Sequence, residues 1–280
     1  MERISATSDL AVKKVLASEE NKDVLQGLIV DFFNIKAEEI SIENPYSIET
    51  YQQMVGGKKM TEFFQTIKDV AASFKVANFV SEIQVRQTHF FDERALYYPF
   101  NRFCKNYGIE GEMQLGSDGK PSKYSSLKPI YALNILGYSH FADDEALRIF
   151  ELYDPKRNKA YKKELIYVGF FELSKTKIET PNQQHWRDYF TTGKVSDTAP
   201  EYIKKASWII EWANLKEEER EMVELLEKAQ ADHDNDMVSA YLDGKEEEKL
   251  ETAKIMLGDG VPRETVAKYT RLSLAQIKAL

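Results

Sequence analysis

Cysteine and long apolar runs are scarce in this sequence. The one cysteine among 280 residues, Cys104, has no partner for an intramolecular disulfide, which excludes a disulfide-stapled secreted domain. The longest apolar stretches, such as 130–136, fall far short of the roughly 20 residues that a membrane-spanning helix needs. The first residues also lack the basic stretch and apolar run of a secretory signal. We therefore expect a globular protein of the reducing cytoplasm with no membrane partner.

An excess of basic charge is missing as well, since the formal net charge is −8. Phosphate contacts usually need a basic surface, so this value alone argues against a nucleic-acid partner. The acidity is local, however: residues 216–251 carry 14 acidic and 5 basic side chains, which leaves 33 basic and 32 acidic side chains in the rest of the chain. The charge therefore does not exclude DNA as a partner.

Hydrophobic patterning predicts an α/β core followed by a helical region. The expected elements are two helices within 8–33, an extended stretch at 40–46, a β-hairpin of strands 67–73 and 75–85, a helix over 90–107, and buried strands over 130–138 and 165–173. From about residue 200 the pattern changes to helices rich in Glu and Lys, and Pro262 and Ser273 begin two short terminal helices. We expect a core domain over 1–195 and a helical C-terminal region over 196–280.

The hairpin contains the polar residues that are most informative about function. Alternate side chains of a strand share a face, so Glu82 and Gln84 should project together from an otherwise apolar strand. Asp69 would return beside Glu82 if the turn falls near Phe74. Two converging carboxylates suit Mg²⁺, a hard cation that prefers oxygen ligands and promotes phosphodiester hydrolysis by activating water and offsetting charge on the phosphate.

These residues carry a resemblance to a known family. The chain resembles the transposase branch of the PD-(D/E)XK nucleases, also called recombination-promoting nucleases, which often has an Asp, a hairpin, Glu-X-Gln and then a helix with an Arg and aromatics. The matching segments are Asp69, Glu82-Ile83-Gln84, Phe90-Phe-Asp-Glu-Arg94-Ala-Leu-Tyr97-Tyr98, the opening Asp9-Leu-Ala-Val-Lys-Lys-Val with Asn21-Lys-Asp-Val-Leu, the strand 127–136 and Phe171-Glu-Leu-Ser-Lys175. The resemblance implies a restriction-endonuclease-like core, with a central mixed sheet flanked by helices.

The resemblance also implies roles for individual residues. Asp69 and Glu82 would be metal ligands, with the Ile83 carbonyl as a third ligand. Gln84 stands where the superfamily usually has lysine, and an amide forms hydrogen bonds but carries no charge. Lys75 on the neighbouring strand is a candidate replacement for that charge and a candidate phosphate contact.

Several of these residues also have a simpler structural interpretation. Gln84 can serve a buried hydrogen-bond network. Arg94 can bind phosphate or pair with Glu82 or Asp92, and the sequence does not decide between these roles. The aromatic residues after Arg94 are favoured as core over a base-stacking platform; they are Tyr97, Tyr98 and Phe100.

The histidines and the terminal segment give weaker signals. The four histidines are too dispersed to predict a zinc site, and His89, although near the expected site, is favoured as structural or exposed. The terminal segment 262–277 resembles a small helix-turn-helix, for which packing or oligomerisation is favoured over DNA reading. The charged C-terminal helices would permit a homodimer.

Together these features predict a Mg²⁺ (or Mn²⁺)-dependent DNA endonuclease linked to mobile elements or recombination. Asp69 and Glu82 would hold the metal, Gln84 would place water or phosphate, and Arg94 would steady the DNA backbone. The alternative is a catalytically inactive member that keeps the fold as a nucleic-acid-binding or protein-interaction module. The missing lysine is the feature that separates the two.

Overall fold

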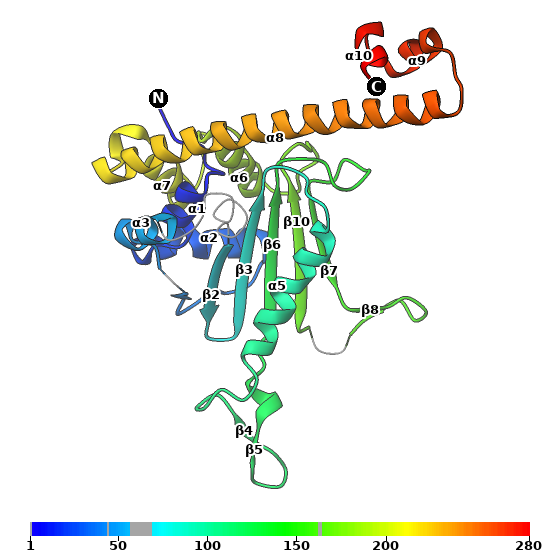
Figure 1. The fold of residues 1–280 in the computed structure, drawn as a ribbon. Coiled ribbons are helices and arrows are strands. Elements are labelled where there is room, and N and C mark those ends of the chain that lie inside the picture. Colours follow the sequence, from blue (N-terminus) through cyan, green and yellow to red (C-terminus); the bar gives the residue numbers. More distant parts are fainter. Residues whose placement is uncertain (1, 44, 57–68, 162–163) are drawn as a thin grey trace. The chain divides into compact units, whose positions relative to one another are not determined.

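A mixed six-stranded sheet forms the centre of the N-terminal part of the chain in the computed structural model (Figure 1). The structure describes residues 2–43, 45–56, 69–161 and 164–280, and at Met54 and Asp69 it describes the backbone alone. The strand order is β1-β2-β3-β6-β10-β7. The strand bounds in that order are Ser41–Ile42, Asp69–Phe74, Ala77–Gln84, Ile130–Leu136, Ile166–Glu172 and Leu147–Glu151. Strands β3, β6 and β10 run parallel, and the other pairs are antiparallel. The expected α/β core with a central mixed sheet is confirmed.

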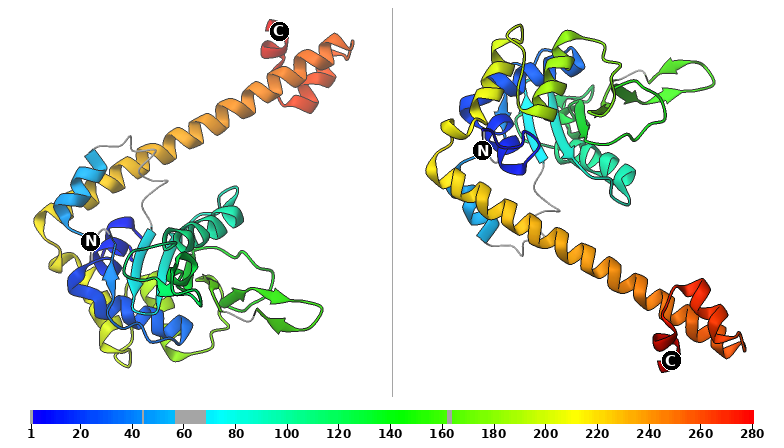
Figure 2. Two further views of the ribbon diagram at one scale, coloured as in Figure 1. Left: turned by 90° about the horizontal axis from the view of Figure 1, so that it is seen from below. Right: turned by 90° about the horizontal axis from the view of Figure 1, so that it is seen from above.

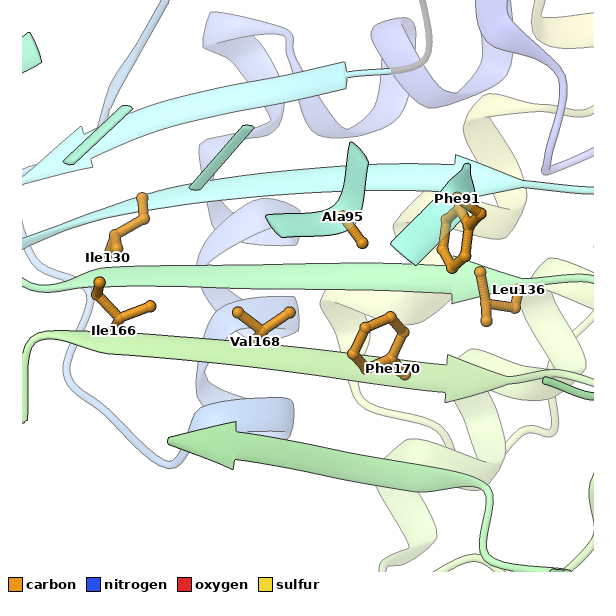
Figure 3. Packing of buried hydrophobic residues seen from close by; sticks show 7 residues of the cluster. All are labelled: Phe91, Ala95, Ile130, Leu136, Ile166, Val168 and Phe170. Atoms are coloured by element: carbon orange, nitrogen blue, oxygen red, sulfur yellow. The ribbon is translucent and has the colours of Figure 1, made fainter. Parts of the chain in front are cut away.

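Helix α5 (Phe91–Lys105) covers one face of this sheet (Figure 1). Its buried residues, Phe91, Ala95 and Pro99, are four positions apart and therefore form one stripe along the helix. This stripe packs on β6 and β10 in an apolar cluster that Figure 3 shows. The cluster consists of Phe91, Ala95, Ile130, Leu136, Ile166, Val168 and Phe170. Burial of each large side chain contributes about 1.5–3 kcal/mol, so the cluster fixes α5 on the sheet.

The opposite face of the sheet packs on α2 (Lys22–Phe33), which follows α1 (Asp9–Leu16) as expected. The Phe32 ring meets Phe171 at 4.8 Å between centroids, and Phe33 lies 6.4 Å from Phe79. Ser8 caps α1 by accepting from the Ala11 N–H at 3.3 Å. Asn21, which precedes α2, forms no side-chain cap, and its amide donates to the Lys14 carbonyl at 2.9 Å.

Two helices that the sequence pattern did not reveal complete this layer, α3 (Ile48–Gly56) and α6 (Pro181–Thr192). The carboxylate of Asp31 on α2 binds α6 and α7 (Glu201–Ile209), since one of its oxygens accepts from Trp186 Nε1 and from the Tyr202 hydroxyl, each at 2.8 Å. Asp31 is half-buried, and hydrogen bonds at both of its carboxylate oxygens hold its partners in fixed positions. These helices therefore form a rigid support behind the sheet.

Two small hairpins extend from the loops around the sheet (Figure 1). One pairs β4 (Gln114–Leu115) with β5 (Pro121–Ser122). The other pairs β8 (Tyr153–Asp154) with β9 (Lys159–Ala160), and the turn between them begins at Asp154-Pro155.

The chain divides into two compact units, residues 1–223 and 224–280, while the expected boundary near 195 stays a prediction. Helix α8 (Glu217–Gly258) is followed by α9 (Arg263–Thr270) and α10 (Leu274–Ala279), which fold back on the end of α8 (Figure 2). Ser273 begins α10 with a capping box to Gln276, as its position indicated. No helix within the described residues is long and apolar enough to cross a membrane.

Candidate functional site

The β2–β3 hairpin brings two acidic positions opposite each other. Its turn falls at Lys75-Val76, immediately after Phe74, and the register pairs Asp69 with Glu82. Directly opposite positions of an antiparallel pair have Cβ atoms about 4.5–5.5 Å apart. The expected position of the turn and the backbone pairing of Asp69 with Glu82 are confirmed. The side chain of Asp69 lies outside the described residues.

Three expected site residues meet at the end of β3. Arg94, in the first turn of α5, donates from Nη2 to Glu82 Oε1 at 2.7 Å and to Gln84 Oε1 at 2.6 Å. The Glu82 side chain is 11% exposed and that of Arg94 28%, so this ion pair is largely shielded from water. Of the pairings considered for Arg94, the one with Glu82 forms; Asp92 instead lies 2.8 Å from His140 Nε2.

The amide of Gln84 is fixed in orientation by hydrogen bonds at both of its polar atoms. Its oxygen accepts from Arg94, and its nitrogen donates to the Arg86 carbonyl at 2.6 Å. Arg94 is therefore the cation that lies nearest to the position where the superfamily usually has lysine. A guanidinium is always charged and has several donors in a plane, so it can bind a carboxylate, an amide and a phosphate oxygen.

Ile83 and Lys75 have different surroundings. The Ile83 side chain is buried at 1% exposure, on the opposite face of β3 from Glu82 and Gln84. Lys75 lies in the turn at the far end of the hairpin, where Nζ is 3.2 Å from Glu39 Oε1. Glu82 is the sixth residue of β3, which begins after this turn, and each strand residue adds about 3.3 Å. The structure therefore does not bring Lys75 to the carboxylates, and Arg94 takes the position that was expected for its charge.

Tyr138 is a neighbour of this site that the sequence analysis missed. It follows Gly137, whose N–H donates to the Gln84 carbonyl at 2.9 Å; a Cβ at Gly137 would lie 2.9 Å from the Val85 carbonyl oxygen. The Tyr138 hydroxyl oxygen is buried and has no hydrogen-bond partner among the described residues. Burial raises the pKa of Tyr138 to about 12, so the hydroxyl stays protonated at neutral pH and can donate. A glycine and tyrosine directly after a buried strand are the signal that could have revealed it.

The segment that carries Tyr138 and His140 is held by a buried ion pair. Glu172, at 0% exposure, accepts from the His140 N–H at 2.5 Å and the Phe141 N–H at 3.2 Å. Its other oxygen lies 2.9 Å from Lys175 Nζ, which also donates to the Phe141 carbonyl at 2.8 Å. The Phe171-Glu-Leu-Ser-Lys175 motif therefore fixes the loop after β6 beside the end of β3.

A cavity of about 390 Å³ adjoins Glu82 between α5 and strands β2, β3 and β6. The helix contributes Tyr97, Tyr98 and five further positions along its length to the lining. The expectation that the aromatic residues of this helix belong to the core is wrong for Tyr97, which is 60% exposed, and for Phe100, at 41%. Both lie outside the buried stripe that begins at Phe91, and Tyr97 lines the cavity instead.

The donor atoms fit a hard divalent cation in chemical type. Glu82 offers a carboxylate, and the position of Asp69 directly opposite can offer a second; Mg²⁺ is commonly bound by one or two protein carboxylates. Within the described side chains, which do not include that of Asp69, no cluster of three His, Cys, Asp or Glu residues forms. One of these oxygen atoms, Glu82 Oε1, pairs with the Arg94 guanidinium in this structure.

Comparison with known proteins agrees with this fold. No match was found among curated proteins or among solved structures. The family model of the PD-(D/E)XK nuclease family transposases matches residues 6–240, which include all of the sheet and every site residue described above. The match supports a nuclease or transposase-related role and confirms the resemblance seen in the sequence. The chain belongs to the PD-(D/E)XK nuclease family transposases.

Proposed function

We propose that this protein is a DNA endonuclease that hydrolyses phosphodiester bonds with Mg²⁺ or Mn²⁺ and acts in the movement or recombination of DNA. The observation that supports this most directly is the register that pairs Asp69 with Glu82, next to a hydrogen-bonded Gln84 and Arg94. The family match adds DNA as the substrate class. The near-neutral charge outside residues 216–251 is compatible with binding DNA locally at this site.

In this proposal the carboxylates of Asp69 and Glu82 and the Ile83 carbonyl hold the metal ion. When bound, the ion lowers the pKa of a coordinated water and offsets the charge that develops on the phosphate. Gln84 orients the attacking water or a phosphate oxygen through its amide. Arg94 binds the DNA phosphate once Glu82 turns toward the metal, since its guanidinium is already next to the site.

Tyr138 adds a neutral donor to this arrangement. Its hydroxyl remains protonated well above neutral pH, because burial raises the pKa of Tyr138. A protonated phenol beside Arg94 can donate to a phosphate oxygen without adding charge. The proposed site therefore combines two carboxylates with one cation and one neutral donor.

A second candidate is favoured by one specific observation. In the structure the Arg94 guanidinium already neutralises Glu82 at 2.7 Å, and glutamine occupies the position of the usual lysine. A chain with these features can keep the nuclease fold as a nucleic-acid-binding or protein-interaction module that does not hydrolyse DNA. This candidate predicts that the protein binds DNA equally well with and without metal and does not cut it.

A plasmid-nicking assay distinguishes the two candidates. Supercoiled plasmid is incubated with the full chain in Mg²⁺, in Mn²⁺ and in a chelator, alongside Asp69→Asn and Glu82→Gln. Glu39→Gln is the matched control, because Glu39 is an exposed carboxylate in the turn region, 69% exposed and paired with Lys75. Metal-dependent nicking that is lost in both site variants and kept in the control supports the endonuclease. Absence of nicking by the wild-type chain, or equal nicking by all variants, supports the binding module.

We also propose that the C-terminal helices mediate a homodimer. On α8 four apolar residues are exposed at helical spacing, from 56% to 66%: Met237, Val238, Tyr241 and Leu242. An apolar stripe of this kind on a long helix is typical of a helix–helix interface. Light scattering of the full chain should give a dimer mass that Leu242→Glu lowers to a monomer. A monomer mass for the wild-type chain would rule this interface out.

A further inference from the structure

The cavity beside Glu82 is lined by polar groups at a position where a helix normally packs on a sheet through apolar side chains. Asn134, on β6, is 4% exposed, and its amide donates to the Gly169 carbonyl at 3.1 Å. Arg102, on α5, pairs with Glu43 and also reaches Asn78 Oδ1 at 3.4 Å. Burying amides and a guanidinium costs free energy unless they bind a partner. This polar lining therefore indicates a binding site instead of a core.

Asn78 and Arg102 also keep unused donors near the cavity. Asn78 is 1% exposed, and within the described part of the chain its Nδ2 has no hydrogen-bond partner; the same holds for Nε of Arg102. Each buried donor without a partner costs free energy. Such groups are the ones that an oxygen-rich or nitrogen-rich ligand would satisfy.

Helix α5 supplies aromatic rings and a cation at the mouth of the same cavity. Tyr97 and Tyr98 lie edge to face with ring centroids 5.7 Å apart, and Asn101 donates to the Tyr97 hydroxyl at 2.9 Å. Lys105 is exposed and forms no ion pair or hydrogen bond with any described residue. Aromatic rings stack on nucleobases, amides hydrogen-bond to base edges, and a lysine binds phosphate.

The size of the cavity limits what it can accept. At about 390 Å³ the cavity lies at the small end of ligand pockets and can take a single nucleotide. A DNA duplex is too wide to enter it, since the major groove alone measures about 12 Å across. A base reaches such a pocket only when it is unpaired and unstacked from its neighbours. Glu82 lies in the wall of the cavity, so a nucleotide bound there would be next to the phosphate to be cut.

We propose that this cavity binds one unpaired nucleotide of the substrate, so that the preferred DNA is single-stranded or locally unpaired at the cleavage site. The proposal rests on the proposed function, because Glu82 belongs both to the cavity and to the proposed metal site. It adds the class of DNA structure that the site selects, and it assigns nucleotide recognition to Tyr98, Asn101 and Lys105.

Binding without metal tests this proposal separately from cleavage. The affinity of the full chain is measured by fluorescence anisotropy in a chelator for a fully paired duplex and for the same duplex with a short unpaired bubble. We expect the bubble to bind about tenfold more tightly, because stacking of one base on an aromatic ring contributes on that order. Tyr98→Ala should remove this preference, and Tyr98→Phe, which keeps the ring, should retain it.

Two further variants test the cavity independently, in case Tyr98→Ala does not fold. Asn101→Ala should lower the preference for the bubble several-fold, and Lys105→Gln should weaken binding to both DNAs and reduce the slope of log affinity against log salt by about one. Lys204→Gln, on α7 and outside the cavity, is the control and should change neither quantity.

The outcomes separate the two proposals. Equal affinity for the two DNAs, or a preference that survives both Tyr98→Ala and Asn101→Ala, would overturn the nucleotide pocket. Cleavage of paired and unpaired DNA at equal rates would also overturn it, although the endonuclease proposal would stand. A preference that depends on Tyr98, in a protein that never cuts DNA, would keep the pocket and refute the endonuclease.

Discussion

The layer between α5 and the sheet has two halves of opposite character. Over β6 and β10 it is apolar, with Phe91, Leu136 and Phe170 in contact; over β2 and β3 it is polar, with Glu82 and Arg94 in an ion pair. One helix covers both halves, so the apolar half provides the free energy that keeps the polar half in place. The comparison teaches that stability and chemistry are separated within a single helix–sheet layer, and substitutions should affect them separately.

Glu82→Gln is expected to have the largest effect, and only on chemistry. Glu82 is a proposed metal ligand, and removing one group from a preorganised electrostatic site typically costs about 10²–10³ in rate, so plasmid nicking should fall by that order. The melting temperature should change little, since the amide can still accept from Arg94. A large loss of stability together with a small loss of nicking would contradict the division of roles.

Phe170→Ala should have the converse effect. Truncating a large buried aromatic side chain costs about 3–5 kcal/mol of unfolding free energy, and Phe170 is 7% exposed in the apolar cluster. Urea unfolding measures this loss directly. At a temperature where the variant is still folded, its nicking rate should stay within a few-fold of wild type, and a fall comparable with that of Glu82→Gln would show that the two halves are not separable.

Arg94→Lys tests how the polar half uses its cation. Lysine keeps the charge but cannot bind Glu82 and Gln84 through one planar group as the guanidinium does. We expect about a tenfold lower cleavage rate, with the salt dependence of DNA binding unchanged because the charge remains. Full activity of the lysine variant would show that charge alone matters at this position.

Tyr138→Phe is expected to have the smallest effect, and it depends on pH. Burial raises the pKa of Tyr138 to about 12 in the folded chain, whereas an unfolded tyrosine ionises near pH 10. The contribution of this group to stability is therefore present below about pH 10 and is lost as the pH rises toward about 12. Urea unfolding below and above pH 10 should show that the free energy of unfolding falls less at alkaline pH in Tyr138→Phe than in wild type. Equal falls in the two proteins would contradict this direction.

The strands and the pairing of Asp69 with Glu82 could be predicted because they depend on local pattern. A two-residue turn between two β-prone runs determines which positions lie opposite each other, and the structure has that register. The caps at Ser8 and Ser273 were predictable for the same reason, since each involves neighbouring residues. Helix α6 was missed because its burial depends on partners far away in the sequence, such as Asp31.

The partners of the site residues could not be predicted from spacing. Which anion Arg94 pairs with is decided by how α5 lies across the sheet, and this depends on the apolar cluster around Phe91. Tyr138 reaches the site because the chain passes close to Val85 at Gly137, an approach between two strands that are distant in sequence. Lys75 was considered for the site although a turn near Phe74 already places it at the opposite end of the hairpin from Glu82.

Metal binding measured without DNA tests the central claim most directly. Titration of Mn²⁺ into the full chain, followed by the loss of the free-ion signal in electron paramagnetic resonance, should show one bound ion. We expect Asp69→Asn and Glu82→Gln each to abolish it and Glu39→Gln to leave it unchanged. No bound ion in the wild-type chain, or equal binding in all three variants, would contradict the proposal that Asp69 and Glu82 form a metal site.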